Sequence, residues 1–253
     1  MSVVIAIAIT AIMDFTGYFN FSALPLVVII LLFWFIYRLN KVEFGLKLGP
    51  LKYYGYALLY PLFVLGTTAI IALIYGDYSI ENVDWSKLAL NISIGSIFGI
   101  LMVLLTEEGF FRGWLWGSFK RSGMSSKRVL IITSILFTIW HISAVTSGTS
   151  YGLPLHQIPV YLVNAMLLGM IWGLLRLISG SVVVAAFCHA IWNPFAYELF
   201  GFGEKVGALG ITNTAFFGPE VGYLGILLNG LFFLWLWNKA KFGEIKKITT
   251  NSI

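Results

Sequence analysis

Residues 88–118 read LALNISIGSIFGILMVLLTEEGFFRGWLWGS, an apolar stretch that carries two adjacent carboxylates, Glu107 and Glu108. About 20 apolar residues suffice for a helix to cross the ~30 Å hydrocarbon core of a bilayer. The whole chain has a similar character: of its 253 residues, 59% are hydrophobic and 11% are charged, with a mean hydropathy of +0.89. Soluble domains carry about 25% charged residues. We therefore predict an integral membrane protein and exclude soluble, collagen-like and disordered chains.

Windows of this length predict an all-α, polytopic membrane helical bundle with about eight transmembrane helices. The first span is interrupted by Asp14, and no basic segment precedes Val3, so we expect an uncleaved helix rather than a signal peptide. No linker or internal repeat divides the chain, which predicts a single domain over residues 1–253. The expected spans are 2–19, 22–38, 54–76, 88–118, 129–147, 158–178, 181–200 and 222–238.

Basic residues lie in alternate connections between these spans, and the positive-inside rule places such connections in the cytoplasm. Both termini are therefore predicted to be cytoplasmic. The net charge of +5 follows from this topology, so we expect a lipid bilayer and no nucleic acid as partner. The basic set is Arg38, Lys41, Lys47, Lys52, Lys120, Arg121, Lys127, Arg128, Arg176, Lys239, Lys241, Lys246 and Lys247. The other connections hold Asp77, Glu81, Asp84, Lys87, Glu198, Glu204, Lys205 and Glu220.

Several glycines are spaced four residues apart within the predicted spans. This spacing lets helix backbones approach closely, so we interpret these pairs as packing positions. They are Gly95/Gly99, Gly113/Gly117 and Gly169/Gly173.

Ionisable side chains inside a span are costly, at about 2.5–3.5 kcal/mol for a central charge on insertion scales. Glu108 and Arg112 are four residues apart and can form an ion pair on one helix face. Glu107 is rotated by about 100° from Glu108 and has no such partner. Burial raises the pKa of an unpaired carboxylate, toward the range of a general base. We predict a supporting role for Glu108 and Arg112 and a catalytic role for Glu107.

Two of the three histidines also lie inside predicted spans. His141 follows Phe137 by one helical turn, and His189 and Asn193 share one helix face. Pro194 disfavours helical geometry at Asn193, which predicts a kink or break beside a cavity. The third histidine, His156, is expected at the surface.

One glutamate and two histidines fit two chemistries. Two histidines and a carboxylate can hold zinc with an open position. Alternatively, the carboxylate activates water while histidine and asparagine donate hydrogen bonds to an oxyanion. Asn193 favours this second reading because it is a poor zinc ligand. Cys188 is a weak candidate for a thiol nucleophile, since adjacent helical residues such as Cys188 and His189 point about 100° apart.

Three motifs in this order, Glu107-Glu108-x-x-x-Arg112, Phe137-x-x-x-His141 and His189-x-x-x-Asn193, resemble the CPBP (Abi) family of intramembrane glutamate proteases. The family includes type II CAAX prenyl endopeptidases and bacteriocin-processing or self-immunity proteins, and the resemblance covers residues 88–200.

The resemblance implies peptide-bond hydrolysis in a cavity open to the cytosolic side, without a metal cofactor. Glu107 is then the general base, His141 positions the water, and His189 and Asn193 form the oxyanion hole. Phe137 joins the supporting residues. The implied substrate is a membrane-associated peptide, cut after a prenylated cysteine to release a C-terminal tripeptide. A bacteriocin-processing or immunity protein and a proton-coupled transporter are the alternatives, because intramembrane Glu and His also build proton relays.

Overall fold

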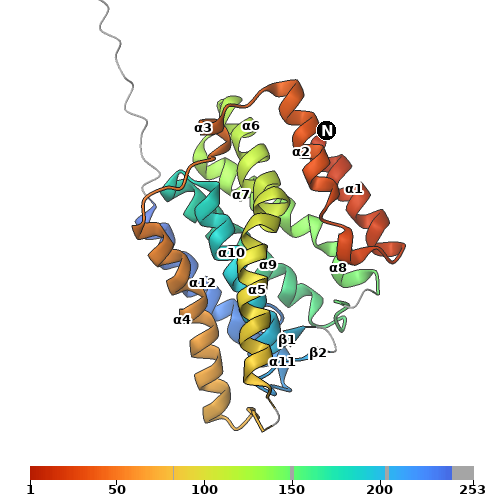
Figure 1. Cartoon of the computed structure of the whole chain (residues 1–253), viewed down its shortest axis with the longest axis vertical. Helices are drawn as coiled ribbons and strands as arrows, with labels where there is room; N and C mark the ends of the chain where they lie inside the picture. The colour runs from red at the N-terminus through yellow and green to blue at the C-terminus, as the bar shows by residue number, and fades with distance from the viewer. Residues whose placement is uncertain (82, 149–150, 203–204, 241–253) are drawn as a thin grey trace, which may run out of the picture.

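The chain folds into a bundle of helices with a single short hairpin among the residues described by the computed structural model, which are 1–81, 83–148, 151–202 and 205–240 (Figure 1). In the hairpin, strands β1 (Gly201–Phe202) and β2 (Lys205–Val206) pair antiparallel. The predicted all-α class is confirmed. The helices are α1 (Ser2–Phe15), the 3-10 helix η1 (Phe19–Phe21), α2 (Pro25–Tyr37), α3 (Lys41–Phe44), α4 (Lys52–Ile74), α5 (Trp85–Leu105), the π-helix η2 (Gly109–Leu115), α6 (Trp116–Arg121), α7 (Ser126–Trp140), α8 (Ile142–Thr146), α9 (Ile158–Ser179), α10 (Val182–Phe200), α11 (Thr214–Phe217) and α12 (Tyr223–Lys239).

Six helical segments of the described chain are long and apolar enough to cross a membrane. The first and eighth predicted spans are helices but shorter: α1 has 14 residues and α12 has 17, about 21 and 26 Å at 1.5 Å per residue. The count of eight therefore stays a prediction. The six segments are Phe19–Tyr37, Lys52–Ile74, Trp85–Arg121, Ser126–Thr146, Ile158–Ser179 and Val182–Phe200.

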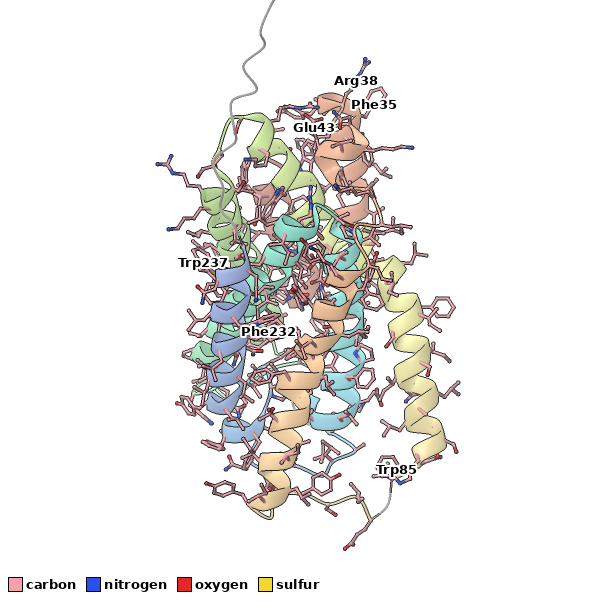
Figure 2. The ribbon with its side chains drawn as sticks, turned by 90° about the vertical axis from the view of Figure 1, so that its left-hand side faces the viewer. Phe35, Arg38, Glu43, Trp85, Phe232 and Trp237 are labelled. Atoms are coloured by element: carbon pink, nitrogen blue, oxygen red, sulfur yellow. The ribbon has the colours of Figure 1, made fainter. Side chains whose placement is uncertain are left out.

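The outer surface of the bundle is apolar, as expected for contact with lipid. Helix α5 stands at one edge of the bundle (Figure 2). It begins the apolar helical segment Trp85–Arg121, and only 6% of an 18-residue apolar stretch of that segment is buried. Arg38 and Glu43 lie at one end of the molecule and Trp85 at the other (Figure 2). The described basic residues Lys41, Lys120 and Arg121 belong to α3 and α6 at the first end (Figure 1), whereas Lys241, Lys246, Lys247 and Glu204 lie outside the described residues.

Helix α1 turns its polar side chains inward. Its buried positions are Ser2, Ala6, Thr10 and Asp14, one on every turn. Ser2 accepts a hydrogen bond from the Trp114 indole at 3.2 Å, and Thr10 accepts one from the Trp140 indole at 2.8 Å. Apolar side chains such as Val4 and Ile12 point outward. A polar stripe on the inner face is the arrangement that a lipid environment favours.

The glycine pairs lie where helices meet. A Cβ on Gly95 would lie 3.0 Å from the Pro194 side chain, and one on Gly99 would lie 3.4 Å from the Ala190 Cβ. These positions bring α5 against α10. A Cβ on Gly173 would lie 2.4 Å from the Leu130 side chain, so α9 and α7 also approach closely there.

Helix α10 continues through Pro194 to Phe200. Of the predicted kink or break at Asn193, the break is therefore wrong and the kink stays a prediction. Proline removes only the hydrogen bond to the carbonyl four residues earlier, here Ala190. In membrane helices, packed neighbours compensate for that loss, and the backbone of α5 at Gly99 supplies such a neighbour.

Candidate active site

The predicted fourth span is interrupted where its two carboxylates lie. Helix α5 ends at Leu105, the backbone of Thr106 leaves the helical region with φ −106° and ψ −100°, and the π-helix η2 begins at Gly109. A Cβ on Gly109 would lie 2.3 Å from the Leu104 carbonyl oxygen, so only glycine fits. Single-turn π segments inside helices often mark functional sites. The irregular turn presents Glu107 and Glu108 in different directions.

Glu108 is fully buried and anchors a network of charged groups. Its Oε1 accepts a hydrogen bond from Arg112 Nη1 at 2.9 Å, and both side chains are 0% exposed. Arg112 Nη2 donates to the Gly169 carbonyl at 2.9 Å, and its guanidinium lies 4.4 Å from the Phe137 ring. The predicted ion pair and the supporting position of Phe137 agree with this geometry.

His189 is fixed by the same carboxylate. Its Nδ1 lies 3.0 Å from Glu108 Oε1, and its ring stacks on Trp172 with a centroid distance of 3.7 Å and an interplanar angle of 13°. A carboxylate on one ring nitrogen and an indole on one face leave Nε2 as the free edge of the imidazole.

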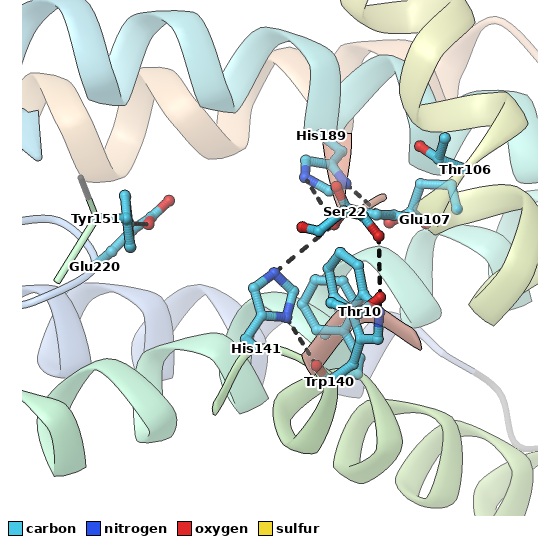
Figure 3. Close-up of polar contacts among 12 residues, drawn as sticks. Thr10, Ser22, Thr106, Glu107, Trp140, His141, Tyr151, His189 and Glu220 are labelled. Carbon is cyan, nitrogen blue, oxygen red and sulfur yellow. Dashed lines mark hydrogen bonds and ion pairs between the residues drawn. The ribbon is translucent and has the colours of Figure 1, made fainter. Parts of the chain in front are cut away.

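Glu107 lies between the two intramembrane histidines (Figure 3). Its Oε2 is 3.8 Å from His141 Nε2 and 4.0 Å from His189 Nε2. His141 Nδ1 contacts the Phe137 carbonyl at 2.8 Å, and the two ring centroids lie 4.3 Å apart, so Phe137 holds the imidazole through its backbone and its side chain. Glu107 is 15% exposed and has no ion pair with Arg112 among the described residues. The sequence-based separation of the two glutamates into different environments therefore holds in the structure.

A cavity of about 280 Å³ opens beside Glu107 and His141. Asn193 lines it, and no described residue forms a hydrogen bond with its side chain. The structure thus brings Glu107, His141 and Asn193 to one cavity and places His189 directly behind Glu107. His156 is exposed, as predicted, and Cys188 is buried.

Two residues assigned to loop charges from the sequence are instead buried. Arg176 is 6% exposed and donates to the carbonyls of Arg112 and Glu43. Glu220 is 7% exposed and accepts hydrogen bonds from Tyr151 and the Trp192 indole, each at 2.6 Å. Burial raises the pKa of Glu220, against the opposing effect of these hydrogen bonds. A count of loop charges cannot separate such groups from solvated ones.

The sequence did not reveal that three further residues, Trp172, Gly169 and Asp14, contribute to the site. Trp172 gave no signal, because a tryptophan in a span is ordinary. Gly169 was recognised as a packing position, and the structure adds that a Cβ there would lie 3.3 Å from Arg112 Nη2. Asp14 was treated as an interruption of the first span, although the four-residue spacing of Thr10 and Asp14 marks one helix face.

No described group of three or more His, Cys, Asp or Glu side chains is arranged to hold a metal ion. His141 and His189 nevertheless both approach Glu107, and Glu108 contacts His189 Nδ1 at 3.0 Å.

The fold and the site define a polytopic membrane protein with a carboxylate–imidazole site inside its spanning helices. Residues 89–195 match the family described as type II CAAX prenyl endopeptidase Rce1-like. This part of the chain is similar to that family of membrane endopeptidases, which confirms the predicted resemblance. The matched region runs from α5 into α10 and contains all seven predicted site residues. No curated protein matches the chain.

Proposed function

We propose that the protein is an intramembrane endopeptidase in which Glu107 activates a water molecule. This proposal rests on the position of Glu107, whose Oε2 lies within 4.0 Å of Nε2 of both His141 and His189. Arg112 forms its ion pair with the neighbouring Glu108 instead. A carboxylate that no arginine or lysine neutralises can take a proton from water.

The position of His141 supports this role. A carbonyl oxygen only accepts hydrogen bonds, so the contact with Phe137 assigns the proton of the neutral ring to Nδ1. Nε2 is then an acceptor. Its separation of 3.8 Å from Glu107 Oε2 is too long for a hydrogen bond and suits a bridging water. Such a water donates one proton to each group and directs a lone pair toward the substrate.

His189 and Asn193 supply the oxyanion donors in this proposal. Glu108 accepts at His189 Nδ1, so Nε2 donates only when the ring is an imidazolium. Two carboxylates and the Arg112 guanidinium leave one negative charge, which an imidazolium at His189 balances. The free carboxamide of Asn193 adds a neutral donor from the same helix face.

The proposed peptide hydrolysis begins with the water between Glu107 and His141. The water oxygen attacks the scissile carbonyl carbon, and its proton passes to Glu107. The carbonyl oxygen takes up the negative charge and is stabilised by the two donors. Collapse of the tetrahedral intermediate breaks the C–N bond, and the proton on Glu107 passes to the leaving amine. The products are a carboxylic acid and an amine, and transfer of the remaining water proton from the acid to the amine gives the carboxylate and the ammonium.

For the substrate we propose a membrane-associated peptide cut after a prenylated cysteine, as the family implies. This assignment rests on the family and on the position of the site within spanning helices. An unprenylated peptide of equal sequence is the comparison that tests it.

One observation favours a second substrate class. Cavity residues Asn20 and Tyr151 belong to the connections α1–α2 and α8–α9. Both connections join helix ends that lie away from the basic connections around Arg38 and Arg176. If the basic connections are cytosolic, as the positive-inside rule predicts, a cavity mouth at Asn20 and Tyr151 faces the other side of the membrane. The family resemblance instead implies a mouth on the cytosolic side. A mouth on the side away from the basic loops favours exported peptides, as in the bacteriocin-related branch.

Cysteine accessibility decides the orientation. Because Cys188 is buried, a cysteine introduced at Asn20 is expected to be the reactive thiol. Labelling of N20C by a membrane-impermeant reagent in intact cells places the mouth outside; labelling only after lysis places it in the cytosol.

We test the reaction with purified protein, farnesylated and unprenylated CAAX-type peptides, and matched pairs of variants. E107Q and H141A are expected to lose at least about 10²-fold in kcat, the lower end for general base catalysis. E81Q and H156A change an exposed glutamate and an exposed histidine and are expected to retain activity. Unchanged cleavage by E107Q contradicts the mechanism.

Two further outcomes separate the alternatives. Activity that survives strong chelators agrees with the metal-free mechanism, whereas loss that Zn²⁺ specifically restores contradicts it. Proton-coupled uptake into vesicles without any cleavage identifies the transporter.

A further inference from the structure

Asp14 is a buried carboxylate in the wall of the catalytic cavity, and the proposed reaction does not use it. It lies at the end of α1, outside the family-matched region 89–195. The side chain is 3% exposed and lines the same cavity as Glu107 and His141.

One oxygen of Asp14 is held and the other is not. Oδ2 accepts a hydrogen bond from Ser143 Oγ at 2.5 Å, the length of a charge-assisted O–H···O⁻ bond. Oδ1 is buried and has no hydrogen-bond partner among the described residues. A buried acceptor of this kind requires a partner from outside the described chain, because leaving it unsatisfied is unfavourable.

No cation of the described chain neutralises Asp14. It has no salt bridge there, and the cavity wall contains two carboxylates but no lysine or arginine. The nearest polar side chain on α1, Thr10, is already occupied: it donates to the Ser22 carbonyl and accepts from the Trp140 indole.

The neighbouring buried acid, Glu220, shows the contrasting case. Each of its carboxylate oxygens accepts a hydrogen bond, one from Tyr151 and one from Trp192. Glu220 is therefore internally satisfied and Asp14 is not. Glu108 Oε2 is also buried without a partner, but its carboxylate is neutralised by Arg112 and does not line the cavity, whereas Asp14 does.

Ser143 places Asp14 close to the reaction centre along the chain. It lies two residues after His141, at the start of α8, so Asp14 is fixed to the turn that carries the water-positioning histidine. Asp14 and Glu107 line the same cavity, so a peptide bound with its scissile bond at Glu107 has a nearby side chain within the cavity that contains Asp14.

We propose that Asp14 binds a cationic side chain of the substrate peptide, an arginine or lysine within a few residues of the scissile bond. The inference rests on the proposed function, because it takes the occupant of the cavity to be a peptide. A guanidinium or ammonium donates to Oδ1 and neutralises the carboxylate, whereas a substrate carboxylate at this point is repelled. Asp14 is thus a specificity residue supplied by α1 to a site that the other helices build.

The test compares peptides that differ only in charge. Arginine is scanned over the three positions on each side of the scissile bond, apart from the cysteine directly before it, and each peptide is paired with its citrulline twin, a neutral analogue of similar shape. For the full-length wild-type protein, we expect one arginine position to lower KM at least tenfold relative to citrulline, with little change in kcat. In D14N the arginine-to-citrulline ratio falls to about one, while N20A, which alters another cavity residue, retains it.

Binding of the same labelled peptides to E107Q separates this proposal from the proposed function. If the arginine preference persists in E107Q and disappears in E107Q/D14N, Asp14 is the recognition group even if no peptide is cleaved. If the preference disappears in E107Q alone, Glu107 binds the cation and the proposal is overturned. Equal binding of both peptides by wild-type protein also overturns it. The melting temperature of D14N, and D14E as a charge-retaining variant that keeps the preference, separate loss of recognition from loss of the fold.

Discussion

Replacing Glu108 by glutamine tests whether the buried charge network holds the site together. Glu108 and Arg112 are both 0% exposed, and Glu108 Oε1 accepts from Arg112 and His189. Hydrogen bonds to charged groups contribute about 1.5–3 kcal/mol, against about 0.5–1.5 for neutral pairs, so two weakened bonds cost about 2–3 kcal/mol. The guanidinium left without a counter-charge brings the expected loss of unfolding free energy to about 3–5 kcal/mol.

The measurement is equilibrium unfolding in mixed detergent micelles, followed by tryptophan fluorescence. The matched control is E43Q, which removes a charge from the Glu43–Arg121 pair. That pair is solvated, with side chains 29% and 39% exposed, and solvated pairs contribute about 0–1 kcal/mol. Glutamine also preserves the capping box of Glu43 with Asn40.

A double variant tests whether the charges of Glu108 and Arg112 compensate each other. E108L/R112M removes both charges, and apolar replacement of a buried pair is often neutral or stabilising. We expect the double variant to be more stable than either single variant, although inactive because His189 loses its anchor. Equal losses for E108Q and E43Q, or a double variant whose loss is the sum of the single ones, would refute the account of a mutually compensated pair.

The remaining predictions concern the irregular turn and the second buried acid. G109A forces a methyl group toward the Leu104 carbonyl, 2.3 Å from the ideal Cβ position, and is expected to destabilise the protein by about 1–3 kcal/mol. G66A, whose Cβ meets nothing within 4 Å, is expected to be neutral or stabilising by up to about 1 kcal/mol; equal melting temperatures for the two variants would exclude the steric argument. Burial raises the pKa of Glu220 in the folded state, so the folded protein binds more protons than the unfolded chain, and stability falls as pH rises from the ordinary glutamate range through the raised pKa. E220Q is expected to flatten this pH dependence in unfolding curves, and an unaltered slope would contradict it.

The parts of the site that were predictable are those governed by local spacing. The four-residue separation of Glu108 and Arg112 was enough to predict their ion pair, because neighbours on a helix face are set by the helix itself. The approach of His141 and His189 to Glu107 is a long-range feature, and only the family resemblance predicted it. Asn193 reaches the cavity from a helix that continues, not from the predicted break.

The parts that were not predictable depend on which face of an element is buried. Arg176 and Glu220 lie near helix ends, and the sequence treats a charge there as solvated. Burial, which depends on how helices pack, turns both into internal hydrogen-bonding groups. The interruption at Thr106 was also hidden, since no proline marks it and apolar residues continue on both sides of the segment Thr106-Glu107-Glu108.

The inward polar stripe of α1 has a consequence for synthesis of the protein. The residues that hydrogen-bond to this stripe come much later in the chain. The pairs are Ser2–Trp114, Thr10–Trp140 and Asp14–Ser143, with separations of 112, 130 and 129 residues. At about 5–20 residues per second, α1 is made roughly 6–26 s before these partners. During that interval its buried-face hydroxyls and carboxylate have none of these contacts, and a carboxylate alone in hydrocarbon is unfavourable. Helix α1 is therefore made well before these partners, and its docking against them completes the wall that carries Asp14.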